Sequence, residues 1–160
     1  MRLLVDHSRF LRSNSMSEVY LAISGAPDRL LGHIDEDGIV TRSQPGVDEV
    51  IGRVDLKTGH VRQQRLGPDR NVGHIDLGSG KVYASRLGPD EYVGQVKPDG
   101  SLHRHVSLQA DRYIGKVSRF VSYAHSGAAM LLLVLPAIKA DQPTEEDKSA
   151  DTPAEDNTSA

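Results

Sequence analysis

The sequence predicts a small all-β protein in which repeated β-hairpins of about 21 residues close into a barrel or ring. First, a short motif recurs five times at a spacing of 20 or 21 residues: an aliphatic residue, Gly, a polar residue, then Ile or Val. Second, glycine-containing turns divide the intervening sequence into strands of roughly 4 to 8 residues, too short for a helical repeat. Third, the 160 residues include no Cys, so packing alone must hold the fold together.

Each copy of the motif also places an aspartate four residues before the glycine. The ten repeat positions are Asp28 and Gly32, Asp48 and Gly52, Asp69 and Gly73, Asp90 and Gly94, and Asp111 and Gly115. Because the residue after the glycine is always polar, we expect it to face water and the glycine to face the interior. In the third copy, Val72 and His74 would then point outward. An inward glycine leaves room where backbones converge or where a strand bends sharply, so its role is structural.

Downstream of each of the first four copies lies a turn that ends in glycine, at Gly38, Gly59, Gly80 and Gly100. Glycine supplies the positive φ that such turns require. Each of these copies therefore forms one hairpin, whereas the fifth has only its outgoing strand. Residues 18–23 look like the missing return strand, and pairing of the two chain ends would close the ring without a free edge. The sequence thus predicts four intact hairpins and one split hairpin.

The Val/Ile-Gly-x-Ile/Val-Asp core, the turn ending in glycine and the period of about 20 residues together resemble the bacterial β-flower proteins. The resemblance covers roughly residues 19–140. It implies a shallow barrel of symmetric hairpins around an apolar centre, with some likeness to Tubby C-terminal domains. A Tubby-like domain carries a helix through the centre of its barrel. The resemblance implies a fold rather than a function.

Composition divides the chain into four parts. We expect an N-terminal extension over 1–18, the hairpin barrel over 19–117, an apolar segment over 118–140 and an acidic tail over 141–160. The tail carries a net charge of −6 against −3 for the whole chain, which leaves the rest mildly basic at +3. It has no apolar periodicity, so we expect it to be disordered. The beginning of the chain has no charged leader before an apolar run, which favours a cytoplasmic location.

The segment from Ser126 to Ile138 is apolar and breaks the repeat pattern. A helix that is apolar all round is most easily accommodated inside a barrel, so we expect a helix or strand over 126–135 that plugs the centre. Two alternatives stay open. Residues 120–138 are close to the ~20 residues that span a bilayer and would anchor the domain in a membrane. The segment could also lie exposed and dock a partner or a membrane face.

The aspartates allow two interpretations. An aligned ring of the five repeat aspartates would offer carboxylate oxygens to a hard cation. Capping of loop amides by the same side chains is the simpler interpretation, and we prefer it here and for Asp35, Asp55 and Asp76. We therefore predict no metal site.

The histidines show a similar contrast between a metal site and an ordinary surface. His33 and His74 occupy equivalent positions, but Arg, Gln and Lys fill the other three, as expected of surface positions. His103 and His105 would share one strand face without an evident third ligand. The sequence also shows no serine elbow, phosphate-binding loop or pair of catalytic acids.

Three hypotheses on function follow. We expect a non-enzymatic binding or scaffold module without a cofactor, whose barrel centre or basic rim engages an apolar ligand, a lipid headgroup or a protein partner. One alternative is a membrane-tethered repeat domain anchored by residues 120–138, and the other is an enzyme of unidentified type. With no Trp and 4% aromatic residues, the chain lacks the stacking platform of single-strand readers, so nucleic acid is not an expected partner.

Overall fold

The computed structural model describes residues 15–142, so most of the extension predicted over 1–18 and of the disordered tail predicted over 141–160 lies outside the described residues. The described part consists of ten strands followed by one helical segment. The strands are β1 (Ser17–Leu21), β2 (Arg29–Ile34), β3 (Ile39–Arg42), β4 (Glu49–Val54), β5 (His60–Gln63), β6 (Arg70–Ile75), β7 (Lys81–Ala84), β8 (Glu91–Val96), β9 (Ser101–Arg104) and β10 (Arg112–Val117). The barrel therefore begins at Ser17 rather than at residue 19.

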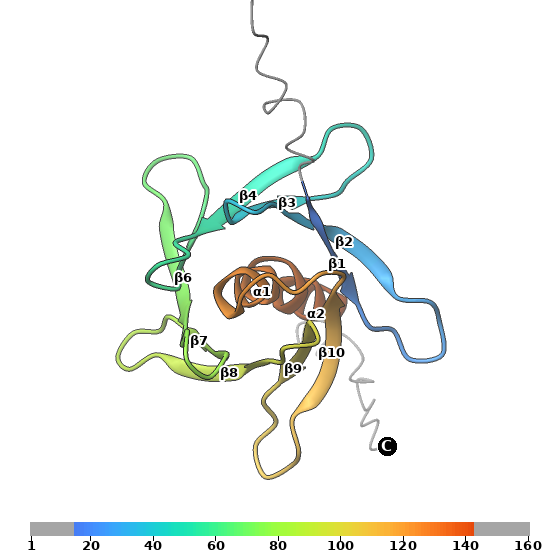
Figure 1. Cartoon of the computed structure of the whole chain (residues 1–160), viewed down its shortest axis with the longest axis vertical. Coiled ribbons are helices and arrows are strands. Elements are labelled where there is room, and N and C mark those ends of the chain that lie inside the picture. The colour runs from blue at the N-terminus through green and yellow to red at the C-terminus, as the bar shows by residue number, and fades with distance from the viewer. Residues whose placement is uncertain (1–14, 143–160) are drawn as a thin grey trace, which may run out of the picture.

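The strands form one closed antiparallel barrel in which each strand pairs with its neighbours in sequence. The last strand pairs with the first, with Val19 opposite Val117, and the Ser118 amide donates to the Glu18 carbonyl oxygen at 2.8 Å. Figure 1 shows the resulting ring. The predicted closure between the two ends of the repeat is confirmed, and the described strands leave no edge open for pairing with another chain.

Tight turns at one end of the barrel alternate with long loops at the other, and we call these the turn end and the loop end. The four turns contain Gly38, Gly59, Gly80 and Gly100, each with the positive φ that the sequence predicts. The five long loops cover residues 22–28, 43–48, 64–69, 85–90 and 105–111, and they radiate around the ring in Figure 1. The barrel thus has five long-loop hairpins of similar form, β1–β2, β3–β4, β5–β6, β7–β8 and β9–β10, which are related by rotation about its axis.

Every hairpin that carries a long loop has one β-bulge, and the bulge lies beside the repeat glycine. In β5–β6, Val61 pairs with Gly73 and the next residue, Arg62, pairs with Asn71, so Val72 is an extra residue. The same shift occurs in the other four hairpins. The prediction that Val72 points outward with His74 is therefore wrong. The bulge interrupts the alternation, and Val72 is half-buried and packs against the core.

The five repeat glycines lie where two backbones approach each other. A Cβ at any of them would overlap a carbonyl oxygen of the adjacent strand. Three of them also face the central helix: a Cβ at Gly52, Gly73 or Gly94 would crowd Leu132, Leu131 or Met130, respectively. These glycines let the barrel close tightly and admit the helix.

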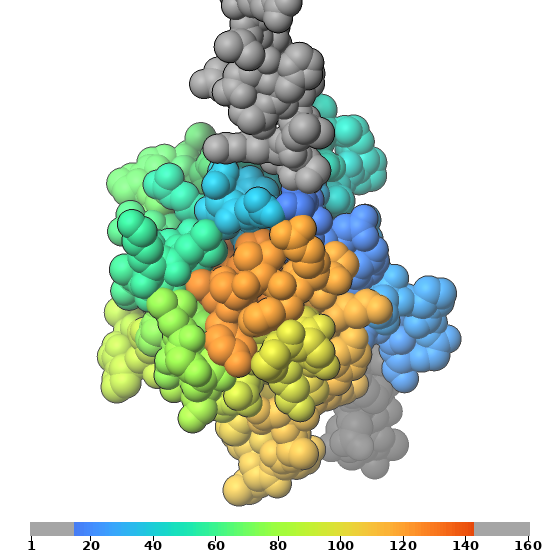
Figure 2. All heavy atoms as spheres, viewed as in Figure 1, coloured from blue at the N-terminus to red at the C-terminus, as the bar shows by residue number. Residues whose placement is uncertain are grey.

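One helical segment fills the barrel, as predicted for the apolar sequence. It consists of α1 (Tyr123–Ala129), a π-helical turn η2 (Met130–Val134) and α2 (Leu135–Asp141). Ser122 caps its start by accepting from the His125 amide at 3.2 Å. The wider turn of η2 ends two residues before Pro136, which has no amide hydrogen to continue an α-helical ladder. Figures 1 and 2 show the helix at the centre of the ring, with its first turns closing the turn end.

The core is the space between the helix and the inward side chains of the strands. Apolar residues with almost no solvent exposure come from both partners, for example Ile34, Ile75 and Leu102 of the barrel and Met130 and Val134 of the helix. Gly127 lets the helix approach β6, since a Cβ there would overlap the Ile75 side chain. The helix is therefore an integral part of the hydrophobic core.

Candidate functional site

The aspartates at the turn end cap the tight turns, as predicted. Asp35, Asp55 and Asp76 each accept a backbone amide of their own turn at 2.9 Å. Backbone amides of the turn, together with the side chain of Ser79 beside Asp76, lower the pKa of Asp55 and of Asp76, because they stabilise the ionised carboxylate. These side chains are committed to local structure.

The repeat aspartates behave differently from the prediction. Within residues 15–142, none of the five accepts a backbone amide, so the predicted loop capping does not hold for them. Three instead reach the residue after the glycine of the preceding unit: Asp28 pairs with Lys116 at 3.8 Å, Asp69 with Arg53 at 3.6 Å and Asp90 with His74 at 2.9 Å. They link neighbouring hairpins across the outer wall. No group of three or more His, Asp or Glu in the described chain could hold a metal ion.

The two histidines of the His-x-His sequence have separate partners. The His103 ring lies 3.2 Å from the Ser101 hydroxyl, and the His105 Nδ1 lies 3.1 Å from Asp111. Burial lowers the pKa of His103, because desolvation disfavours the imidazolium. The two side chains do not converge on a common site.

A hollow at the loop end, where the helix leaves the barrel, combines an apolar floor with a cationic rim. We call it the mouth. It has a volume of about 660 Å³, within the range of roughly 300 to 1,000 Å³ that is usual for small-molecule sites. The floor consists of side chains of the helix and of two neighbouring strands: Leu131, Leu135, Ile138, Ala84 and Val93.

The rim of the mouth carries more positive than negative charge. Its cations are Arg70, Arg86, Arg104 and Lys139, and its one carboxylate, Glu91, pairs with Arg86 at 2.5 Å. Arg104 also lies directly opposite Arg112 in the β9–β10 register, and two like charges in that arrangement repel each other. No carboxylate of residues 15–142 forms an ion pair with Arg70, Arg104 or Lys139. An anionic group at the rim would relieve this repulsion.

One side of the mouth is held by a hydrogen-bonded cluster. Asp111 accepts from the Tyr92 hydroxyl at 3.2 Å and faces His105, and the Tyr92 and His105 rings lie 4.9 Å apart. Burial, with the neighbouring charge of Asp111 and its hydrogen bond, raises the pKa of Tyr92, so the hydroxyl stays protonated near neutral pH. This cluster fixes the ring of Tyr92 against the rim as a flat, partly apolar surface.

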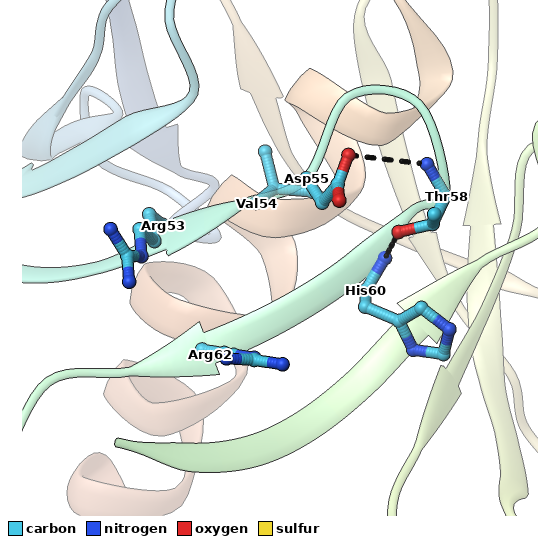
Figure 3. A pocket seen from close by; sticks show the side chains of 6 residues that line it. All are labelled: Arg53, Val54, Asp55, Thr58, His60 and Arg62. Atoms are coloured by element: carbon cyan, nitrogen blue, oxygen red, sulfur yellow. Dashed lines mark hydrogen bonds between the residues drawn. The ribbon is translucent and has the colours of Figure 1, made fainter. Parts of the chain in front are cut away.

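A second hollow, on the outer wall between β4 and β5, is lined mostly by charged and polar residues, with Val54 as its one aliphatic residue. Figure 3 shows Arg53, Arg62 and His60 around it, together with Asp55 and its hydrogen bond to the Thr58 amide. Arg53 lies opposite Arg62 in the register, but Asp69 reaches Arg53 and Asp55 stands beside the pair. The charges here balance, and Val54 is the one aliphatic residue of the lining, whereas five aliphatic side chains form the floor of the mouth, so the mouth is the stronger candidate.

The helix buries a histidine and a serine that no solvent reaches. His125 is fully buried, and its Nε2 lies 3.0 Å from the Asp35 carbonyl oxygen. Since a carbonyl oxygen can only accept, Nε2 carries the hydrogen, and Nδ1 has no partner in the described structure. Burial lowers the pKa of His125, because a charge there would lie in an apolar interior. This side chain and the equally buried Ser126 cannot meet a soluble substrate.

Comparison of the chain with family models, curated proteins and solved structures finds no match. The resemblance to β-flower proteins therefore stays a prediction. Function has to be argued from the geometry of the mouth.

The mouth has little signature in the sequence. Its three arginines have counterparts in other repeats, such as Arg29 for Arg70, Arg65 for Arg86 and Arg42 for Arg104, so they do not single out one place on the ring. Most of its floor belongs to the helix, which lies outside the repeat. The one usable signal is the excess of positive charge outside the acidic tail.

Proposed function

We propose that the protein is a non-enzymatic binding module whose mouth takes an amphiphile with an anionic head group. The observation that carries the proposal is an apolar floor beside Arg70, Arg104 and Lys139, which form no ion pair with a carboxylate of residues 15–142. An apolar chain would cover Leu135 and Ile138, which the solvent otherwise reaches in part, above the buried Leu131. A carboxylate or phosphate would lie among Arg70, Arg104 and Lys139, where guanidinium groups can donate to two oxygens at once.

The β-flower resemblance supports this proposal through fold alone, because it implies hairpins around an apolar centre. The centre itself is filled by the helix, which leaves the mouth as the accessible part of the apolar interior. A ligand bound there would lie at the edge of the core rather than deep within it. We therefore expect moderate affinity and tolerance of different chain lengths.

The test uses dodecanoate below its micellar concentration as the probe, with dodecanol and hexanoate for comparison. A ligand that binds only the folded state raises the melting temperature. We expect a saturable rise with dodecanoate and smaller rises with the two comparison probes, since one lacks the charge and the other most of the chain. Absence of a saturable rise with dodecanoate would contradict the proposal.

Two variants and a control localise the effect. Leu135→Asn removes part of the floor and Arg104→Gln removes a rim cation, and each should weaken dodecanoate binding. Only Leu135→Asn should weaken the binding of dodecanol. Lys57→Gln removes one positive charge from the turn end and should leave both unchanged. Equal binding by all three variants would place the ligand elsewhere.

Membrane anchoring through residues 120–138 is the second candidate. Tyr123–Asp141 is long and apolar enough to cross a membrane by length and composition, while 61% of the segment lies buried inside the barrel. Anchoring would require the helix to leave the barrel and expose its core. Detergent extraction of cells that express the chain with and without residues 120–160 tests this: a full chain released only by detergent, with a folded and soluble truncated chain, would support anchoring.

A further inference from the structure

The loop end carries a ring of five exposed apolar side chains, four of which contact little else in the protein. Leu66, Leu87 and Leu108 have relative exposures of 103%, 106% and 105%, and Val47 reaches 82%. With Ile23, at 37%, each of the five long loops presents one aliphatic side chain. We call these five residues the loop tips. Isolated exposed leucines are common, but their recurrence in five rotationally related loops is not explained by packing.

One loop keeps its apolar tip at a cost to its backbone. The other four long loops contain a glycine with positive φ, such as Gly67 and Gly88. In the fifth loop Leu108 itself has φ of 64°, and it is the one residue other than glycine with positive φ in the described chain. A leucine in this region is strained by its Cβ, and glycine would relieve the strain. The strain of Leu108 is therefore not offset by contacts of its side chain within the described structure, since that side chain is fully exposed.

The arrangement of the tips favours a bilayer over a protein partner. The five long loops all lie at the loop end, and Figure 1 shows them spread around the ring. Each tip is a single side chain with a charged or polar residue on at least one side, as in Arg65-Leu66-Gly67. A stable protein interface needs roughly 800 Å² of contiguous surface on each partner, which five separate side chains do not offer. A lipid surface is fluid and can receive them separately.

The charges of the loop end indicate which kind of bilayer the loop tips would enter. The five loops with their flanking strand residues (22–30, 42–50, 63–71, 84–92 and 104–112) and the end of the helix (139–142) hold eight cationic and eight acidic residues. The cations are Arg29, Arg42, Arg65, Arg70, Arg86, Arg104, Arg112 and Lys139, and the acids are Asp28, Asp48, Glu49, Asp69, Asp90, Glu91, Asp111 and Asp141. The sequence after Gln142 adds further negative charge. This end has no net attraction to an anionic surface.

We infer that the loop tips dock the barrel onto electrically neutral lipid bilayers by shallow insertion of five aliphatic side chains. The docking surface is distinct from the mouth, but it surrounds it, so a docked barrel presents the mouth to the membrane. Binding depends on apolar contact and is insensitive to salt. Several weak insertions act together, so the whole ring binds far more tightly than any single tip.

The experiment is sedimentation of the full chain with phosphatidylcholine vesicles. The triple variant L66S/L87S/L108S should lose binding by roughly a hundredfold, since each lost insertion costs about fivefold. Leu77→Ser makes the same change at the turn end, where Leu77 is exposed to 42%, and should bind as the wild type does. Leu108→Gly should raise the melting temperature while weakening vesicle binding, which a purely structural role of Leu108 would not produce.

Several outcomes would overturn the inference. The first is failure of the wild type to sediment with phosphatidylcholine vesicles, and the second is equal binding by the triple variant. The third is binding that needs anionic lipid and disappears in 0.5 M salt, where charges are screened within roughly 5 Å. Sedimentation equilibrium adds one more: a wild-type dimer that the triple variant abolishes would make a second copy the partner. The dodecanoate test of the mouth uses no vesicles, so the two proposals can fail separately.

Discussion

Replacement of Gly73 by alanine tests the idea that the repeat glycines let backbone and helix meet. The added Cβ would overlap the Tyr83 carbonyl oxygen and lie 3.0 Å from Leu131 Cδ1. Tyr83 pairs with His74 on one side and with Tyr92 on the other, so its carbonyl group cannot move without disturbing two ladders. The methyl group introduced at position 73 therefore has no direction in which it could move without a loss of stability.

The expected loss of stability follows from these contacts. Overpacking of a filled core costs about 1 to 3 kcal/mol, and a weakened ladder hydrogen bond costs about 0.5 to 1.5 kcal/mol more. We therefore expect Gly73→Ala to reduce the free energy of unfolding by about 3 kcal/mol. A small domain has about 5 to 15 kcal/mol in total, so the variant should fold but melt much earlier.

Urea denaturation followed by circular dichroism measures the effect, with two glycines as controls. Gly78 is exposed and a Cβ there meets only Asp76 Oδ1 at 3.4 Å, so Gly78→Ala should be neutral or slightly stabilising. Gly88 has open space but φ of 99°, so Gly88→Ala should cost about 1 kcal/mol from the backbone alone. A Gly73→Ala variant as stable as Gly78→Ala would refute the close-contact argument.

Three further predictions concern the helix and the loops. Because burial lowers the pKa of His125 in the folded protein, the unfolded chain binds one more proton at low pH. The free energy of unfolding should therefore fall by at most about 1.4 kcal/mol per pH unit as the pH drops below about 6.5. His125→Gln should remove this dependence from denaturation curves between pH 5 and 8, and an unchanged slope would contradict the assignment. Leu132→Ala should cost about 2 to 5 kcal/mol in the same assay, because the side chain is 7% exposed inside the barrel. Leu87→Ser should change stability by less than about 0.5 kcal/mol, and a larger loss would mean that this tip packs against the protein.

The ring could be predicted because five copies of one pattern restrict each other's interpretation. A single Val-Gly-His-Ile is compatible with many structures, whereas five in register with glycine turns fix strand length, turn position and closure. The bulge escaped prediction because strict alternation was assumed. The aliphatic residue before each glycine was the available signal: Leu31, Ile51, Val72, Val93 and Ile114 are too regular for outward positions.

The candidate site was harder to predict, because it depends on contacts between segments that differ from one repeat to the next. Arg104 and Leu135 are far apart in sequence and meet only because the helix passes through the ring. The prediction that the repeat aspartates cap loop amides is wrong for a related reason. Their partners, such as Lys116 for Asp28, lie in the neighbouring hairpin, and that neighbour is known only when the order of the strands is known.

The position of the plug in the chain has a consequence for biosynthesis. All ten strands leave the ribosome before the helix whose side chains complete their core, and β1 must wait for β10, about 100 residues later, to close the ring. Strands with unpaired edges and an empty interior then stay exposed to other nascent chains. Long-range pairing of this kind also folds slowly. The protein should therefore depend on a holding chaperone during translation, and the interval of greatest risk ends only when the helix has been synthesised.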